Sequence, residues 1–221
     1  MNAQTRPRSR GAKTILTRDA IATAALTALE SGGPAGLTMR RVAALLDTGP
    51  SSLYAHVKNL EDLQGLVLDE MSTTIALAPA AAQPDPIDAV VTLMQSYATA
   101  LREHPGTAAI ALTTPPVGPG FLDFAEAFAV TLRAMGVGPA ETMGSFDKLV
   151  LLVTATVAEQ EASFRNDPTV SIGDRYADAL AAQPADAPAR PLLQALLRTG
   201  HPDHDDITWT VTTFLRGLTP A

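Results

Sequence analysis

The chain lacks cysteine altogether, and this absence excludes several kinds of chemistry. A disulfide scaffold, a zinc site built on thiolates and a cysteine nucleophile all require that residue. No apolar run approaches the roughly 20 residues that a transmembrane helix needs. The N-terminal segment TRPRSRGAK has no apolar stretch behind it, so we do not expect a secretory signal. We therefore expect a cytoplasmic protein that does not enter a membrane.

The signatures of common active sites are missing as well. The sequence shows no Gly-rich phosphate loop between a strand and a helix, and no legible Ser/His/Asp arrangement. Glu159 and Glu161 are two positions apart, so on a helix they face different sides. The segment HPDHDD at 201–206 has metal-binding residue types, but we interpret it as a solvated loop whose Asp caps the last helix. We accordingly predict no catalytic residue, no cofactor and no metal.

Positive charge is scarce and unevenly placed. The 221 residues carry 16 Lys or Arg against 23 Asp or Glu, for a net charge of -7. Residues 1–58 nevertheless hold eight basic and three acidic residues, a net charge of +5, and the remainder carries -12. A basic head on an acidic body is expected when only the head touches phosphates. A basic tail beside an ordinary domain would give the same balance, because residues 1–15 supply half of those positive charges.

Helical periodicity dominates what is present, and no segment alternates with the period of a strand. The residues placed to cap helices are Thr17, Thr38, Asn59 and Asp85. Later helices are expected over 106–113, 120–135, 140–165, 173–182, 190–199 and 204–218. The run APAAAQP at 78–84 is predicted to be a linker. We predict an all-α fold with a disordered basic arm at 1–15, a helix-turn-helix DNA-binding domain at 16–60, and a helical effector-binding and dimerisation domain at 61–221.

The most informative stretch is LTMRRVAALLDTGPSSLYAHVKNL, from Leu37 to Leu60. It predicts two short helices around a tight turn at Asp47-Thr48-Gly49. Pro50 would open the second helix, where its missing N–H costs nothing. The apolar residues expected to face inward from the first of these helices are Val42, Leu45 and Leu46. Such a helix-turn-helix places its second helix in the DNA major groove.

This stretch resembles the TetR family of bacterial repressors. The resemblance rests on Gly36-Leu37-Thr38, on Arg40-Arg41-Val42-Ala43 and above all on LYAHVKN at 53–59, which is close to the tetracycline-repressor branch. It covers about residues 17–70. The resemblance implies that three N-terminal helices bind DNA, and that the body binds an effector and dimerises through two C-terminal helices.

Carried over by position, the resemblance implies which residues contact DNA. The predicted DNA-binding residues are Arg18, Thr38, Met39, Arg40, Thr48, Gly49, Pro50, Ser51, Ser52, Tyr54, His56 and Lys58. Ser, Thr, Tyr, Arg and Lys side chains are the usual phosphate anchors. Taken alone, Tyr54 could be a core aromatic residue and His56 a surface or capping histidine. Asp47 takes the usual turn glycine position, and Pro50-Ser51 and Ala55 also depart from the tetracycline-repressor pattern, so we expect a different operator.

Aromatic and methionine residues recur along the helices of the body, where they could line a cavity for a small apolar ligand. The predicted ligand-binding residues are Met94, Tyr97, His104, Phe121, Phe124, Phe128, Met143, Phe146, Glu159 and Gln160. The alternative for each aromatic residue is ordinary core packing. For Glu159 and Gln160, the alternative is a solvated helix face.

Together these features predict a transcriptional regulator that a small, largely apolar molecule releases from double-stranded, palindromic operator DNA. We expect a homodimer held by helices 140–165 and 204–218. The residues of the last helix expected to face the partner are Ile207, Val211, Phe214, Leu215 and Leu218. Packing of these residues within one monomer is the alternative. A helical enzyme and an architectural DNA-binding protein without a ligand are the rival functions.

Overall fold

The computed structural model describes residues 16–166, 172–182, 184, 190–199 and 207–218, and every regular element among them is a helix. The all-α prediction is therefore confirmed. The helices are α1 (Arg18–Gly36), α2 (Met39–Leu45), α3 (Pro50–Leu53), α4 (Leu60–Ser72), α5 (Ala78–Ala81), α6 (Pro86–Glu103), α7 (Thr107–Ala111), α8 (Pro119–Ala134), α9 (Pro139–Asn166), α10 (Ile172–Ala181), α11 (Arg190–Thr199) and α12 (Ile207–Leu218). The predicted arm at 1–15 and the cluster at 201–206 lie outside the described residues.

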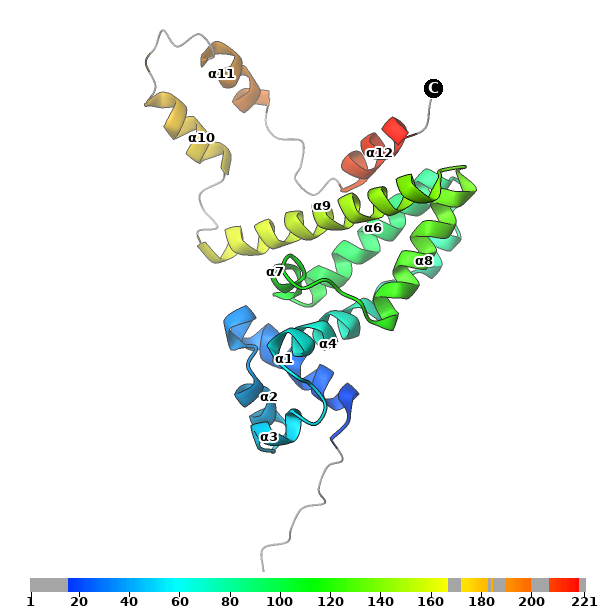
Figure 1. The fold of residues 1–221 in the computed structure, drawn as a ribbon. Coiled ribbons are helices and arrows are strands. Elements are labelled where there is room, and N and C mark those ends of the chain that lie inside the picture. Colours follow the sequence, from blue (N-terminus) through cyan, green and yellow to red (C-terminus); the bar gives the residue numbers. More distant parts are fainter. Residues whose placement is uncertain (1–15, 167–171, 183, 185–189, 200–206, 219–221) are drawn as a thin grey trace, which may run out of the picture.

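The helices form a small head and a larger body (Figure 1). Helices α1, α2 and α3 make the head, and α4 lies between the head and the body. In the body, α9 runs along α6 and α8, and α12 packs mainly against α6. One continuous cluster of buried apolar residues runs from the head into the body. Among the described residues, no helix is long and apolar enough to cross a bilayer.

Side-chain caps begin the helices where the sequence predicts them. In each case a side-chain oxygen accepts a backbone N–H of the first turn, which would otherwise lack a partner. The pairs are Thr17 with Ala20 at 3.1 Å, Thr38 with Arg41 at 3.2 Å, Asn59 with Asp62 at 2.8 Å and Asp85 with Ile87 at 2.7 Å. Because these caps are local, they could be read from the sequence.

Three local expectations need correction. Leu45 is 50% exposed and does not face inward with Val42, because α2 ends at this turn. The predicted linker at 78–84 contains the short helix α5, which packs against α6. The last helix begins at Ile207 and not at residue 204.

A glycine is required just before α7, where the chain packs against α1. Gly106 has φ 95°, in the left-handed region that glycine tolerates best. A Cβ there would also lie 3.0 Å from a methyl carbon of Leu29 in α1. Nearby, His104 Nδ1 lies 2.9 Å from Glu30 Oε1, so the end of α6 is joined to α1. These contacts bring the body close against the head.

Candidate DNA-binding surface and effector cavity

The turn between α2 and α3 has the geometry that a helix-turn-helix needs. Asp47 adopts φ 49°, the left-handed conformation expected for the residue after a helix end. Thr48 N donates to Ala43 O at 2.9 Å and Asp47 N donates to Ala44 O at 3.2 Å, which together close a Schellman motif. Pro50 follows at the first position of α3. Asp47 thus adopts the left-handed conformation that a glycine usually provides in this turn, as expected for a residue type that tolerates positive φ.

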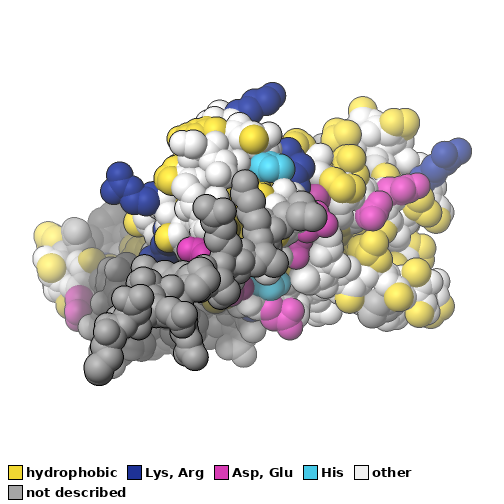
Figure 2. Space-filling view, turned by 90° about the horizontal axis from the view of Figure 1, so that it is seen from below, with side chains coloured by type: hydrophobic (Ala, Val, Ile, Leu, Met, Phe, Trp, Pro, Cys, Tyr) yellow, Lys and Arg dark blue, Asp and Glu magenta, His cyan; other side chains and the backbone are white. Residues whose placement is uncertain are grey.

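Most of the predicted DNA-binding residues are exposed along α2, the turn, and α3 with the residues that follow it. The exposed members are Thr38, Arg40, Gly49, Pro50, Ser51, Ser52, Tyr54 and Lys58. Tyr54 is 57% exposed, so it is not a core aromatic residue. Met39, Thr48 and His56 are half-buried, and Met39 packs against the core. Figure 2 views the molecule from the head end, where Lys, Arg and His side chains lie on the surface.

Two buried side chains fix the segment that carries Tyr54 and His56. Leu53 and Val57 are completely buried, and Val57 N donates to Leu53 O at 2.9 Å. Of the residues between them, Tyr54 and Ala55 are exposed and His56 is half-buried. Arg41, in contrast, turns back from this surface, because its Nη2 donates to Ser31 Oγ at 2.9 Å.

Arg18 is exposed, but its guanidinium makes contacts within the head itself. Its Nη1 donates to the carbonyl of His56 at 3.0 Å, and its Nη2 lies 3.9 Å from Asp62 Oδ1. The other carboxylate oxygen of Asp62 accepts the backbone N–H of Lys58 at 2.9 Å. Sequence reasoning placed Arg18 among the DNA contacts, but it could not foresee this network because Arg18 and His56 are far apart in the chain.

The predicted aromatic residues do gather in the body. Tyr97 stacks on Phe124 with ring centroids 5.1 Å apart, and the ring centroid of Phe146 lies 5.2–5.6 Å from those of Phe121, Phe124 and Phe128. The rings of Tyr97, Phe124 and Phe128 are fully buried. The Tyr97 hydroxyl lies 2.7 Å from Thr154 Oγ1, which in turn donates to Val150 O. Burial raises the pKa of Tyr97 to about 12, although the hydrogen bond to Thr154 partly offsets this effect.

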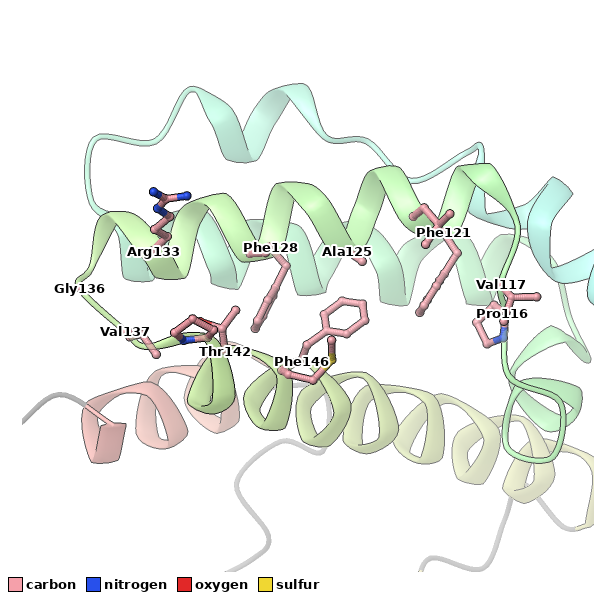
Figure 3. A pocket seen from close by; sticks show the side chains of 14 residues that line it. Pro116, Val117, Phe121, Ala125, Phe128, Arg133, Gly136, Val137, Thr142 and Phe146 are labelled. Atoms are coloured by element: carbon pink, nitrogen blue, oxygen red, sulfur yellow. The ribbon is translucent and has the colours of Figure 1, made fainter.

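A cavity of about 920 Å³ lies between α8 and α9, beside this cluster. Its lining residues are Pro116, Val117, Phe121, Leu122, Ala125, Phe128, Ala129, Arg133, Gly136, Val137, Pro139, Thr142, Met143 and Phe146. Phe121, Ala125 and Phe128 point from α8 toward Phe146 on α9 (Figure 3). Arg133 is the only charged lining residue, and its guanidinium is turned away from the rings. The volume and the apolar lining fit the roughly 300–1,000 Å³ of small-molecule sites.

Only part of the predicted ligand set lines this cavity, namely Phe121, Phe128, Met143 and Phe146. Met94, Tyr97 and Phe124 lie in the core behind it. His104 contacts Glu30, Glu159 is exposed, and Gln160 accepts a hydrogen bond from Arg102, so the structure does not bring these three to the cavity. The loop residues Pro116 and Val117 and the small Ala125 and Ala129 were missed, because only packing shows which face of α8 stays open.

Helix α4 touches one end of the cavity wall. Asp69 Oδ1 accepts the backbone N–H of Gly120 at 2.9 Å, in the first turn of α8. Gln64 Oε1 accepts the hydroxyl of Thr114 at 2.9 Å, just before the lining residues Pro116 and Val117. Because α8 has no side-chain cap of its own, Asp69 supplies that acceptor from another helix. The same helix carries Asp62 at its other end, beside the DNA-binding surface.

The residues of α12 that were predicted to face a partner chain need correction. Ile207, Val211 and Leu215 are buried within the single chain, where α12 packs mainly on α6. The opposite side of α12 exposes Trp209, and the adjoining α9 exposes Leu151 and Leu152. The alternative of packing within one monomer therefore holds for the stripe centred on Val211.

Comparison with known proteins gives the class of protein to which this fold belongs. The family described as tetracyclin repressor-like, C-terminal domain matches residues 78–209. An HTH-type transcriptional regulator of Saccharopolyspora erythraea is 32% identical over 177 residues, 80% of this chain and 74% of that protein. The repressor DrrR1 of Streptomyces coeruleorubidus is 34% identical over 138 residues, 62% of this chain and 51% of that protein.

Solved structures agree over almost the whole length. ActR of Streptomyces coelicolor in its apo form is 29% identical with a TM-score of 0.81, covering 94% of this chain and 96% of that one. The complex of ActR with actinorhodin gives a TM-score of 0.80 at 29% identity, with 93% and 96% covered. The chain belongs to the TetR family of helix-turn-helix transcriptional regulators, which are not enzymes.

Proposed function

We propose that this protein is a repressor that a small, largely apolar molecule releases from palindromic operator DNA. The observation that carries the proposal is the apolar cavity between α8 and α9, whose end wall is hydrogen-bonded to the helix beside the DNA-binding head. The complex of the similar ActR with actinorhodin supports a small-molecule effector. We place the boundary between the DNA-binding unit, residues 16–60, and the effector unit, from residue 61 onward, at the start of α4.

The effect of an occupied cavity on DNA would pass through α4. A ligand against Val117 and Phe121 pushes on the start of α8, which Asp69 ties to α4. The N-terminal end of α4 holds the backbone of Lys58 through Asp62. A small movement of α4 would therefore move the DNA-binding surface. The coupling need only be about 1–3 kcal/mol, and it must be reciprocal between ligand and DNA.

Operator binding would require two copies of the chain. Two recognition segments related by a two-fold axis meet major grooves about one turn, ~34 Å, or slightly more apart. The exposed apolar residues Leu151, Leu152 and Trp209 on α9 and α12 supply a surface for such a homodimer. An isologous contact would pair this surface with itself.

Filling the cavity tests the proposal. Ala125 lines the cavity from α8, so Ala125→Trp should occupy it, while Val130→Trp places the same ring on an exposed position of α8 that does not line the cavity. The assay measures release from a DNA site selected with the wild-type protein, using actinorhodin and a panel of apolar compounds as probes. We expect a compound that raises the melting temperature and releases DNA for the wild-type and Val130→Trp proteins only.

Two results would reject the proposal. The first is a compound that releases DNA equally well from the Ala125→Trp protein, because its site would then lie elsewhere. The second is a panel in which no compound changes either the melting temperature or the DNA affinity, which favours the architectural DNA-binding protein. Sequence-specific binding to DNA by the head would stand in both cases.

A further inference from the structure

We propose that Arg18 is a positioning residue for the DNA-reading segment and not a phosphate contact. With Asp62, it holds the backbone of the residues that directly follow α3, the second helix of the helix-turn-helix. The proposal rests on DNA binding by the head and not on the effector. It reassigns a residue whose charge and position in the chain predict a DNA contact.

The first step is what the Arg18 guanidinium already contacts. Its Nη1 donates to the His56 carbonyl at 3.0 Å, and its Nη2 lies 3.9 Å from Asp62 Oδ1. The side chain is 54% exposed, so solvent screens the ion pair, and the shorter hydrogen bond is the more specific contact. An arginine has a rigid fork of donors, which allows it to hold two oxygens at once.

The second step is why the His56 carbonyl needs a partner. Helix α3 has only four regular residues, Pro50–Leu53, and the helical turns end where His56 N and Val57 N both donate to Leu53 O. Carbonyls at such an end lack a following N–H, and they carry the negative end of the peptide dipoles. A guanidinium is well suited to this position. Arg18 therefore stabilises the end of the segment that presents Tyr54 and His56.

The third step is that the segment is held from two sides. Asp62 Oδ2 accepts the Lys58 N–H at 2.9 Å, and Asp62 N donates to Asn59 Oδ1 at 2.8 Å. Arg18 comes from the start of α1, whereas Asp62 comes from the start of α4. Together they form a clamp on the four residues from His56 to Asn59. The clamp sets the position and orientation of the exposed residues relative to the DNA bases. A displacement of this segment would affect base contacts more than phosphate contacts.

Salt titration separates positioning from phosphate binding. The proteins compared are the wild type, Arg18→Ala, Arg18→Lys and the phosphate-contact control Lys58→Ala, each on a DNA site selected with the wild type and on random DNA. We expect Arg18→Ala to bind the selected site about tenfold more weakly, with little change on random DNA. The slope of log affinity against log salt should stay the same for Arg18→Ala, while Lys58→Ala in a dimer should reduce it by about 2.

Arg18→Lys keeps the positive charge but loses the planar guanidinium that can donate to two oxygens at once. This variant is therefore informative even if Arg18→Ala folds poorly. A clamp predicts that Arg18→Lys also loses discrimination between selected and random DNA, and that the Lys58 backbone amide exchanges hydrogen faster. Wild-type discrimination by Arg18→Lys, or a salt slope for Arg18→Ala as low as that for Lys58→Ala, would overturn the proposal.

A double-mutant cycle with Asp62→Ala gives an independent check. If the two side chains hold the same segment, the losses in operator affinity from Arg18→Ala and Asp62→Ala should not add. Fully additive losses in correctly folded proteins would show that Arg18 acts separately from the clamp.

Discussion

Asp69 on α4 accepts the backbone N–H of Gly120 on α8 at 2.9 Å, so one helix caps the start of another. The approach is close because Gly118 has no side chain, and a Cβ added there would overlap the Asp69 carboxylate. Two of the next residues along α8, Phe121 and Leu122, line the cavity. The contact therefore joins the cavity wall directly to the helix that adjoins the DNA-binding head.

We predict that Asp69→Ala weakens the communication between effector and operator. The first turn of α8 would lose its acceptor, so movement of α8 would pass less well to α4. In a wild-type protein whose compound lowers DNA affinity about 10–100-fold, the variant should show a factor several-fold smaller, with both separate affinities changed little. Glu70→Ala, at the next position of α4, is the matched control. An unchanged coupling factor in a folded Asp69→Ala protein would contradict this role.

We predict that Tyr54→Phe weakens operator binding while leaving the fold intact. Tyr54 is 57% exposed on the head, so removing its hydroxyl deletes a polar contact without creating a cavity. A loss of about 0.5–1.5 kcal/mol, or up to roughly tenfold in affinity, is expected from one hydrogen bond. Fluorescence anisotropy with labelled DNA would measure this loss, and circular dichroism would confirm the fold. Wild-type affinity would show that the hydroxyl does not touch DNA.

We predict that Trp209→Asp and Val211→Asp fail in different ways. Trp209 is 57% exposed on the proposed dimer surface, whereas Val211 is fully buried within the chain. An Asp at position 209 should give folded monomers, because the charge would be unpaired only in the dimer. An Asp at position 211 should unfold the chain, because an unpaired buried charge costs several kcal/mol. Sedimentation and thermal melts separate the two outcomes, and a dimeric Trp209→Asp protein would argue against this surface.

We predict that alkaline pH destabilises the wild-type protein more than Tyr97→Phe. Burial raises the pKa of Tyr97 from 10.0 to about 12, so the folded state keeps the proton that the unfolded chain releases. Stability contributed by the protonated hydroxyl is therefore complete below pH 10 and is lost as the pH rises toward 12. The difference should reach up to roughly 3 kcal/mol. Urea unfolding of both proteins between pH 9 and about pH 12 would measure this difference. If the free energy of unfolding fell equally with pH in both proteins, the raised pKa of Tyr97 would be contradicted.

The local features of this protein follow from its sequence. Thr17, Thr38, Asn59 and Asp85 cap helices because their side chains reach backbone amides within three residues. The all-α fold follows for the same reason, since helical periodicity depends on neighbours along the chain. The exposure of Tyr54 was predicted only through the family resemblance, because taken alone this residue could have been a core aromatic. The structure shows Tyr54 exposed between the buried side chains of Leu53 and Val57.

Tertiary packing decided the rest, because it determines which side of an apolar helix is covered. Tyr97 and Phe124 lie in the core, whereas Phe121 and Phe146 line the cavity, although all four lie on similar apolar helices. Val211 turned to α6 and left Trp209 exposed. Arg18 met His56 only because the fold brings the start of α1 to the end of the recognition segment. Periodicity identifies an apolar face, but the neighbour that covers that face is fixed only when the helices pack.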